Sequence, residues 1–190
     1  MGKRQEQVDE SRRRVLDAAR ALLRDGGSYT AFTVDAVARR ADVARATVYY
    51  QFGSKTGLLE AVCDDIAEIG QMSGLADAFA NPDPAAALRE FIAVFGRFWA
   101  ADRTVMRRLR ALAALDPDVE AVIAARDARR RQGLAALVGR LDTAAQDRAV
   151  RVLHALTSFE TYDLLAGADG DLADAAPLVA DLAFAAVGLG

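Results

Sequence analysis

The 190-residue sequence predicts an all-α protein, and three observations support this fold class. Hydrophobic residues make up 53% of the chain, and many of them are alanine, the residue with the highest helix propensity. Only four prolines interrupt the chain. Residues that favour β-strands are scattered and do not alternate with polar residues, as they would in a half-buried strand. We therefore expect about nine helices in a chain long enough to bury a sizeable core.

The first helix is expected over residues 9–25, because the apolar residues there recur at the spacing of an amphipathic helix. This apolar stripe consists of Val15, Leu16, Ala19, Leu22 and Leu23. The sequence "DGGSYT" follows it. Gly26 or Gly27 is expected to end the helix, because glycine readily adopts the left-handed conformation that is common at helix C-termini.

Two short helices joined by a three-residue turn are expected next. The first begins after Thr33, whose hydroxyl is suited to an N-cap, and ends near Ala41. The sequence "DVA" forms the turn, and the second short helix covers residues 44–51, with Gly53 closing it. Ser54 then caps a longer fourth helix, "KTGLLEAVCDDIAEI". Two short helices with a tight turn, followed by a longer bracing helix, are typical of a helix-turn-helix.

The rest of the chain is also expected to be helical. The sequence "NPDP" opens a helix that continues to about Ala101, and "RTVMRRLRALAAL" forms a shorter one. Asp116 is a suitable N-cap for a long helix that starts at Pro117, because proline is favoured in a first turn. One helix is expected over residues 143–166, and Pro177 fits the first turn of the last helix.

The charges are distributed unevenly along the chain. The net charge of −3 at first argues against a nucleic-acid partner. However, residues 1–55 hold 11 Lys and Arg against 7 Asp and Glu, whereas residues 56–190 hold 13 against 20. We expect a basic domain over residues 1–55 and an acidic domain over residues 56–190, although a basic surface alone is also compatible with a solvated face.

The sequence offers little support for catalysis, a cofactor or a membrane. Cys63 is the only cysteine and His154 the only histidine, and no cluster has the spacing of metal ligands. Cys63 is interpreted as a small core residue, with a redox-sensing thiol as the alternative. The N-terminal sequence lacks the apolar core of a signal peptide, and no apolar run approaches the ~18 residues of a membrane span. We expect a cytoplasmic protein without a cofactor.

The strongest functional signal is the stretch "RATVYYQFGSKTG", residues 45–57. On a helical wheel, Val48 and Phe52 share the side that faces the preceding helices. The opposite side is small, polar and aromatic, and such a face can enter the DNA major groove, where side chains reach base edges and phosphates. It consists of Ala46, Thr47 and Tyr50, flanked by Arg45 and Tyr49 on one edge and by Gln51 on the other.

Lys55 adds an independent signal at the start of the fourth helix. A cation there opposes the helix dipole at a cost of roughly 0.3–1 kcal/mol. A phosphate bound at the free backbone N–H groups would remove this penalty, and the same reasoning applies to Thr33 at the start of the second helix. The simpler interpretations are a solvated charge for Lys55 and half-buried packing against the first helix for Tyr49 and Tyr50.

The segment "TAFTVDAVARRADVARATVYYQFGSKTGLLEAV", residues 30–62, resembles the DNA-binding segment of tetracycline-repressor-like (TetR family) transcriptional regulators. The matching features are the Thr33–Val34 helix start, "VARRADV", "TVYYQF" and the Ser-Lys pair before two leucines. The motif extends over roughly residues 11–62. The remaining chain is similar only in length and helical pattern, apart from "LTSFETYDLL", which resembles a late-helix segment of some members.

Three positions depart from the family pattern. Asp42 replaces the common turn glycine, but aspartate tolerates a left-handed conformation better than most residues, so the turn can form. Ala44 replaces a small hydroxyl residue, which removes a cap or a phosphate contact. Gln51 replaces a common histidine or tyrosine, so an edge contact at this position is in doubt.

The resemblance implies a homodimeric regulator that binds palindromic double-stranded DNA and a small-molecule effector. We expect a repressor that a mostly apolar ligand releases from its operator. The alternatives are a regulator controlled by a protein partner or by Cys63 oxidation, and a helical enzyme or carrier whose basic domain is only structural. By the resemblance, the DNA contacts are Thr33, Arg45, Thr47, Tyr49, Tyr50 and Lys55. Ala46 is added to them because its small side chain leaves room for close approach of the groove.

The sequence "REFIAVFGRFWA", residues 89–100, is the densest aromatic segment of the second domain. Phe91, Phe95 and Phe98 form one row on the predicted helix, and Ile92 and Trp99 form the adjacent row. These aromatic rows are interpreted either as core packing or as the wall of an effector cavity, since members of the family have an effector cavity in this domain. The arginines of "RDARRRQ", residues 126–132, are either a solvated face or a site for an anionic effector or acidic partner. The expected effector residues are Phe91, Phe95, Phe98, Trp99, Met106, Leu109, His154, Phe159 and Tyr162.

The last two predicted helices carry small and branched residues at three- and four-residue spacing, which suits close helix packing. The resemblance implies a four-helix dimer interface there, with two helices from each subunit. The expected interface residues are Val150, Leu153, Leu156, Leu178, Leu182, Ala185 and Ala186.

Overall fold

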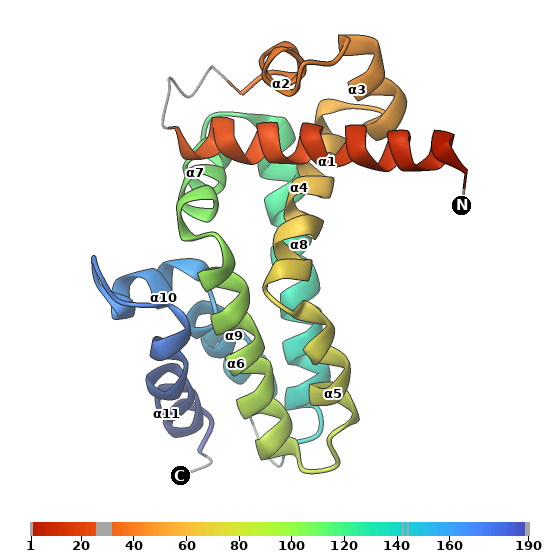
Figure 1. The fold of residues 1–190 in the computed structure, drawn as a ribbon. Coiled ribbons are helices and arrows are strands. Elements are labelled where there is room, and N and C mark those ends of the chain that lie inside the picture. Colours follow the sequence, from red (N-terminus) through yellow and green to blue (C-terminus); the bar gives the residue numbers. More distant parts are fainter. Residues whose placement is uncertain (1, 26–31, 142, 144, 189–190) are drawn as a thin grey trace. The chain divides into compact units, whose positions relative to one another are not determined.

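The structure is a computed structural model that describes residues 2–25, 32–141, 143 and 145–188. All regular secondary structure in these residues is helical, which confirms the predicted all-α fold (Figure 1). The elements are α1 (Lys3–Arg24), α2 (Val34–Ala41), α3 (Arg45–Phe52), α4 (Lys55–Ile69), η2 (Met72–Gly74), α5 (Leu75–Ala80), α6 (Pro84–Ala101), α7 (Arg103–Ala113), α8 (Pro117–Val138), α9 (Gln146–Leu156), α10 (Phe159–Ala166), η3 (Ala173–Ala175) and α11 (Ala176–Val187).

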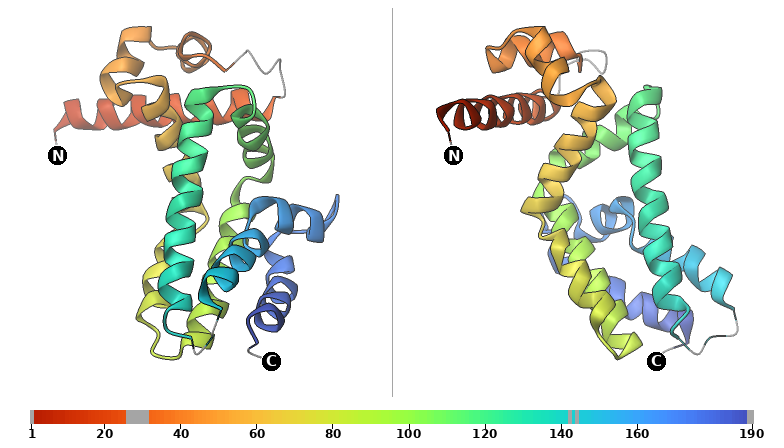
Figure 2. Two further views of the ribbon diagram at one scale, coloured as in Figure 1. Left: turned by 180° about the vertical axis from the view of Figure 1, so that it is seen from behind. Right: turned by 90° about the vertical axis from the view of Figure 1, so that its right-hand side faces the viewer.

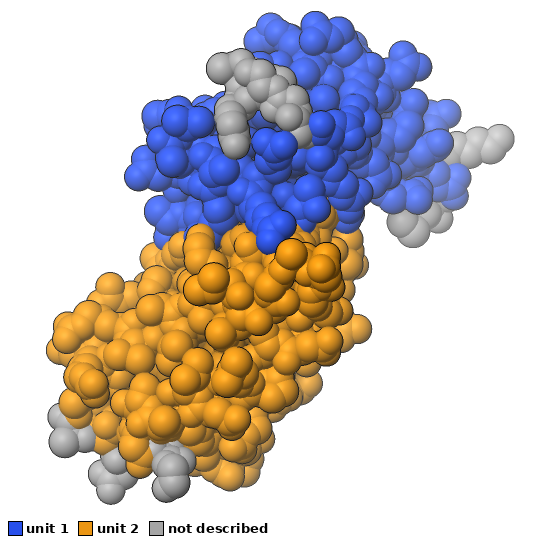
Figure 3. All heavy atoms as spheres, turned by 90° about the vertical axis from the view of Figure 1, so that its left-hand side faces the viewer, with its two compact units in different colours: residues 1–65, 104–124 blue, residues 66–103, 125–190 orange. Residues whose placement is uncertain are grey.

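The chain forms two compact units, coloured separately in Figure 3. Unit 1 contains residues 1–65 and 104–124, and unit 2 contains residues 66–103 and 125–190. The chain passes from one unit to the other three times: within α4, after the first residue of α7 and within α8. The charges suggest a boundary between two functional domains at residue 55. This boundary differs in kind from the division into compact units, and it stays a prediction.

Unit 1 contains the predicted helix-turn-helix. Figures 1 and 2 show α2 and α3 on the same side of α1. The predicted inner face of α2 is buried, as are Val48 and Phe52 of α3, which the helical wheel predicts. Of the apolar stripe of α1, Val15, Ala19 and Leu23 are buried, whereas Leu16 and Leu22 are half-buried. The first helix is longer than expected, because it begins at Lys3 rather than near residue 9. The predicted glycine cap at Gly26 or Gly27 lies outside the described residues.

Unit 2 is built around α6, which packs against α5 and α11. Half of the residues of this helix are buried, among them Phe91, Phe95 and Trp99. The chain enters unit 2 through a tight crossing at Gly70, where an added Cβ atom would lie 2.6 Å from the Cα atom of Phe98. Gly70 therefore allows the end of α4 to lie directly against the backbone of α6.

The predicted count of about nine helices is wrong for two reasons. First, α5 forms as a separate short helix after Gln71, whose left-handed φ of 56° ends the preceding helical path. Second, the helix expected over residues 143–166 is two helices, α9 and α10. The Thr157 hydroxyl donates to the Leu153 carbonyl 2.8 Å away, and the Ser158 side chain accepts from the Thr161 N–H as the N-cap of α10.

The predicted starts of α6 and α8 are confirmed. Asp83 and Asp116 each accept a hydrogen bond from a backbone N–H two residues later, and Pro84 and Pro117 are the first residues of α6 and α8. Pro177 lies in the first turn of α11. Within the described ranges, no helix has the length and apolar character needed to cross a membrane.

Candidate nucleic-acid interface and ligand pocket

The turn between α2 and α3 is tight and is formed without glycine. Asp42 has a left-handed φ of 52°, as the sequence predicts for the position of the missing glycine. The N–H of Val43 donates to the Ala38 carbonyl 3.1 Å away, which closes the end of α2. Ala44 occupies the N-cap position of α3 and makes no side-chain cap.

The outward face of α3 combines an exposed aromatic ring with small residues. Tyr50 is 83% exposed, and the neighbouring Ala46 is also exposed. Thr47 is half-buried, and Tyr49 is 39% exposed at the edge of the face. The buried side of the same helix is held by Val48 and Phe52, so the exposed face has a fixed orientation within unit 1. This surface has the shape and the hydrogen-bonding groups that a DNA groove accepts.

Arg45 and Tyr49 form one edge of this face together with Asp35 of α2. The Arg45 guanidinium lies 3.2 Å from the nearest Asp35 carboxylate oxygen, and it also donates to the Tyr49 hydroxyl 3.2 Å away. The hydrogen bond to Tyr49 and then the Asp35 charge raise the pKa of Arg45. All three residues are exposed, so the cluster orients Arg45 and remains accessible to a phosphate.

Gln51 belongs to the contact with α1 rather than to the outward face. Its side-chain amide N–H donates to the Ser11 hydroxyl 3.1 Å away, and its backbone carbonyl accepts a hydrogen bond from Arg12. The Arg12 guanidinium also lies 4.5 Å from the centre of the Phe52 ring. The hydrogen bond to Ser11 directs the Gln51 side chain, whose DNA contact the sequence leaves in doubt, toward α1.

Two helix N-termini accompany the outward face of α3. Thr33 caps α2, and its hydroxyl oxygen accepts the Ala36 N–H at 3.1 Å, as predicted. At the start of α4, Lys55 forms an ion pair with Asp116, the N-cap residue of α8. The hydrogen bond from Lys55 lowers the pKa of Asp116, although burial partly opposes this effect. Lys55 is therefore paired with a carboxylate and is not the solvated charge of the simpler interpretation.

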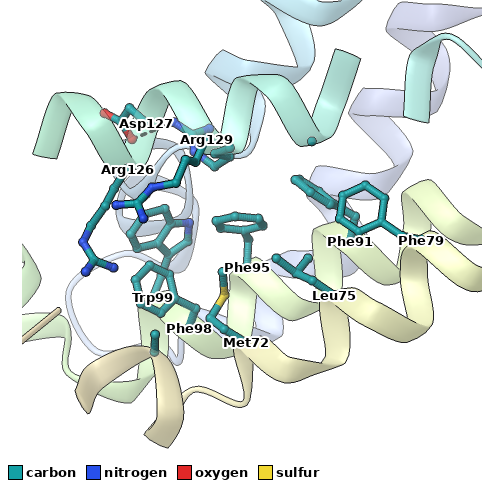
Figure 4. A pocket seen from close by; sticks show the side chains of 13 residues that line it. Met72, Leu75, Phe79, Phe91, Phe95, Phe98, Trp99, Arg126, Asp127 and Arg129 are labelled. Atoms are coloured by element: carbon teal, nitrogen blue, oxygen red, sulfur yellow. Dashed lines mark hydrogen bonds and ion pairs between the residues drawn. The ribbon is translucent and has the colours of Figure 1, made fainter. Parts of the chain in front are cut away.

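Unit 2 contains a pocket of about 290 Å³ beside the aromatic rows of α6 (Figure 4). Four of the expected effector residues line the pocket: Phe91, Phe95, Phe98 and Trp99. The other lining residues come from the end of α4, from η2, α5 and α8: Ala67, Met72, Leu75, Phe79, Arg126, Asp127, Arg129, Arg130 and Gly133.

The pocket has a charged end and an apolar end. Figure 4 shows Arg126, Asp127 and Trp99 at one end and Phe79, Phe91 and Leu75 at the other. At the apolar end, the pocket-lining residue of α8 is a glycine, Gly133. A Cβ atom added to Gly133 would lie 3.1 Å from the Phe79 ring and 3.2 Å from the Phe91 ring.

Arg130 holds the charged end of the pocket in place. This guanidinium is 4% exposed and donates to the Thr157 hydroxyl, the His154 carbonyl and the Asp127 carboxylate at 2.6–3.1 Å. Trp99 joins the same network, because its indole N–H donates to the Thr157 carbonyl 3.1 Å away. The break between α9 and α10 thus supplies the groups that position a pocket arginine and a pocket tryptophan.

The other expected effector residues lie elsewhere. Met106 and Leu109 are buried in unit 1, and Phe159 packs edge-on against Trp99 without reaching the pocket. Tyr162 is fully buried, donates to the Ile92 carbonyl and has its pKa raised by burial. The ring of His154 contacts the Asp127 carbonyl, and burial followed by the Arg130 charge lowers the pKa of His154.

The sequence contains a signal for some of the pocket residues that the prediction did not include. Arg126, Arg130 and Gly133 follow i, i+4 and i+7 spacing, which places them on one face of α8. The alternative of an anionic effector at these arginines therefore had a geometric basis in the sequence. By contrast, no sequence pattern indicates Phe79 or Leu75, because α5 is too short to show a period.

The expected dimer residues fall into two groups. Val150 and Leu153 are buried within the chain itself. On α11, Leu178 and Leu182 are 48% and 42% exposed, and Ala185, one turn further along the same face, is exposed as well. Leu156 and Ala186 are half-buried. Cys63 is buried on α4, in agreement with its interpretation as a core residue.

Comparisons with known proteins concern both the DNA-binding segment and the whole fold. The family model described as bacterial regulatory proteins, tetR family, matches residues 15–62. The HTH-type transcriptional repressor KstR of Rhodococcus jostii (strain RHA1) is 54% identical over 50 residues, which are 26% of this chain. The match spans only 23% of the length of KstR.

Solved structures match over nearly the full length. A TetR-like transcriptional regulator from Rhodococcus sp. RHA1 is 25% identical, with a TM-score of 0.67 and coverage of 94% of this chain and 95% of that one. PfmR, a TetR family transcriptional regulator from Thermus thermophilus, shares the fold at 22% identity, with a TM-score of 0.66 and coverage of 89% and 96%. Residues 15–62 thus match the tetR family of bacterial regulatory proteins, and the chain as a whole has the fold of TetR-like transcriptional regulators.

Proposed function

We propose that this chain is a homodimeric, cytoplasmic repressor that binds a palindromic operator and releases it when a small, mostly apolar ligand fills the pocket of unit 2. The observation that carries the DNA-binding part is the outward face of α3, where Tyr50 is 83% exposed while Val48 and Phe52 are buried. A face of this kind can place tyrosine and threonine hydroxyls against phosphates and base edges.

The proposed DNA contacts are those expected from the sequence: Thr33, Arg45, Ala46, Thr47, Tyr49, Tyr50 and Lys55. The geometry supports them in different ways. Thr33 uses its oxygen to cap α2, which leaves its hydroxyl hydrogen available for a phosphate. Ala46 allows close approach of the groove. Lys55 reaches a phosphate only by giving up or sharing its contact with Asp116.

The exposed apolar face of α11 supports the dimer. Leu178, Leu182 and Ala185 repeat at four- and three-residue spacing, which forms one continuous stripe on the helix surface. In a two-fold dimer the same stripe of each subunit would be buried against its copy, together with neighbouring residues of α9. Two copies of α3 would then read two half-sites related by the same symmetry.

The proposed release by a ligand needs a difference in affinity between two conformations. A ligand that binds both conformations equally shifts nothing, so the effector must bind the non-DNA conformation better. The aromatic walls of the pocket favour an apolar ligand, because burial of apolar surface contributes roughly 25 cal/mol per Å². Trp99, the only tryptophan, lines the pocket and gives a direct optical signal of its occupation.

An electrophoretic shift with DNA from upstream of the protein's own gene tests this function. We expect a specific complex whose footprint has dyad symmetry, with half-site centres ~34–36 Å apart or a multiple of this distance. The affinity should fall steeply between about 50 and 200 mM salt, because bound Lys and Arg displace counterions from DNA. A footprint without dyad symmetry, or an affinity that is independent of salt, would exclude this binding mode.

A further inference from the structure

The charged end of the pocket defines the class of ligand. Arg126, Arg129 and Arg130 line this end together with a single carboxylate, Asp127. We propose that the effector is an amphipathic organic acid that places its carboxylate at these arginines and its apolar part toward Phe79. This proposal rests on the proposed function, because it names the ligand class for the same pocket.

Along the pocket, α6 and α8 run in opposite directions, and this arrangement sets the orientation of the ligand. Arg130 lies 5.9 Å from the centre of the Phe95 ring, whereas Gly133 of the same helix approaches Phe91. Arg126 lies at the Trp99 end in Figure 4. From Arg126 to Gly133 the helix rises about 10 Å. A ligand of this length can reach the charged end with its head group and the phenylalanine end with its tail.

The charge balance of the lining favours an anion. Asp127 is already bound to Arg130, so this pair contributes little net charge. Besides this pair, the lining contains two further guanidinium groups, Arg126 and Arg129, and no second carboxylate. Arg129 is exposed and makes no hydrogen bond or ion pair with the other described residues. The planar fork of a guanidinium matches the two oxygens of a carboxylate, and the attraction is strengthened beside a low-dielectric wall.

The two other ligand classes fit less well. Aromatic rings can hold an ammonium group over their faces, and the rows of α6 offer such faces. A cation there would be repelled by three guanidinium groups against one carboxylate. A neutral apolar ligand would fill the space beside Phe91 but would cover the arginines without replacing the water that solvates them. A carboxylate satisfies the charged end and allows the tail to be buried.

The test uses matched ligands on the full chain without DNA. The probes are octanoic acid, 1-octanol and octylamine, and, as a second tail, 2-naphthoic acid, 2-naphthol and 2-naphthylmethylamine. Affinity is measured by calorimetry and by the change in Trp99 emission. We expect at least one acid to bind at least tenfold more tightly than its alcohol and its amine. If neither acid exceeds its alcohol by this factor, if neither acid binds, or if an amine binds best, the proposal is wrong.

A pair of arginine variants shows whether the pocket provides this selectivity. Arg129→Gln should weaken acid binding at least fivefold and leave alcohol binding unchanged, and the double variant Arg126→Gln/Arg129→Gln should weaken it further. Arg131→Gln is the control, because Arg131 is an exposed arginine of the same helix that does not line the pocket. Equal losses of acid binding in Arg129→Gln and Arg131→Gln would place the acid outside the pocket and overturn the proposal.

Operator release then separates this proposal from the proposed function. If the acids bind through Arg129 but the protein binds no operator DNA, the repressor function is refuted and the proposed ligand class is retained. Operator DNA that is bound specifically and released only by the alcohols or amines would refute the ligand class and leave the repressor function standing.

Discussion

Lys55 is the residue at which the folded protein and the proposed DNA complex compete for one charge. Its ammonium is paired with Asp116, 61 positions away in sequence. The sequence could predict the cation at the start of α4, because it depends on local capping rules. It could not predict the carboxylate opposite, because that partner is brought there by the fold of α7 and α8 within unit 1.

Replacement of Lys55 and replacement of Asp116 should change the affinity for DNA in opposite directions. Lys55→Ala should weaken binding to all sequences and reduce the salt slope by about 1, since one phosphate contact is lost. Asp116→Asn should strengthen binding, because Lys55 no longer has to leave a carboxylate, and asparagine preserves the N-cap of α8. Fluorescence anisotropy over a salt series measures both effects.

The control for Asp116→Asn is Glu120→Gln, which removes the same charge from an exposed position on the first turns of α8. If the two variants increase DNA affinity equally, the effect is general electrostatics, and the ion pair has no specific role. An unchanged salt slope in Lys55→Ala would show that Lys55 does not contact phosphate.

His154 should make the stability of the protein sensitive to mild acid. Burial and the neighbouring Arg130 lower its pKa, so the unfolded chain, with a pKa of about 6.5, binds the proton more readily. This contribution to stability is complete above about pH 6.5 and is lost as the pH falls toward the folded-state pKa. When the pH is lowered from about 7.5 to about 5.5, the melting temperature of the His154→Gln variant should therefore decrease less than that of the wild-type protein. A parallel decrease in both proteins would contradict this.

At the scale of single elements, the weak point of the DNA-binding unit is the N-terminus of α3. Ala44 has the extended backbone of an N-cap residue but makes no side-chain cap. Ala44→Ser should therefore stabilise the protein by about 0.5–2 kcal/mol, as measured by urea denaturation. Ala46→Ser, which adds the same hydroxyl inside the helix, is the control and should give no gain. If both variants have the same stability, the missing cap is not limiting.

The crossing of α4 and α6 should tolerate no side chain at Gly70. Gly70→Ala would place a methyl group 2.6 Å from the Phe98 backbone, which cannot move aside as a side chain can. We expect a loss of about 1–3 kcal/mol, typical of overpacking. Gly74→Ala is the control, because its Cβ would meet only the side chains of Val94 and Arg97. Melting temperatures that fall equally in the two variants would argue against the backbone contact.

The elements that the sequence predicted well are those with local signals at both ends. Thr33, Asp42 and Gly53 mark the ends of α2 and α3, and the structure confirms each of them. The break at Thr157 and Ser158 was missed because apolar residues continue across it. Its only sequence sign is a hydroxyl pair that can serve equally well inside or at the end of a helix. The pocket walls from η2 and α5 had no sign at all.

At the scale of the whole molecule, the exposed face of α11 is expected to decide the oligomeric state. Leu182→Asp should convert the proposed dimer to a monomer, because a carboxylate would be buried without a partner at the centre of a two-fold contact. Light scattering after size exclusion measures the mass. Ile69→Asp is the control, since Ile69 is exposed to a similar extent on α4. A dimer that persists in Leu182→Asp, or dissociates equally in Ile69→Asp, would place the interface elsewhere.

Gly133 gives the pocket a property that matters for how such a sensor changes over time. The arginines that would select the head group and the glycine that limits the depth of the tail lie on the same helix, about one to two turns apart. One nucleotide change can convert a glycine codon to an alanine codon, and the added methyl would shorten the apolar end by about one carbon of ligand. Tail length and head-group preference can therefore drift independently, and a designer of biosensors can retune one without rebuilding the other.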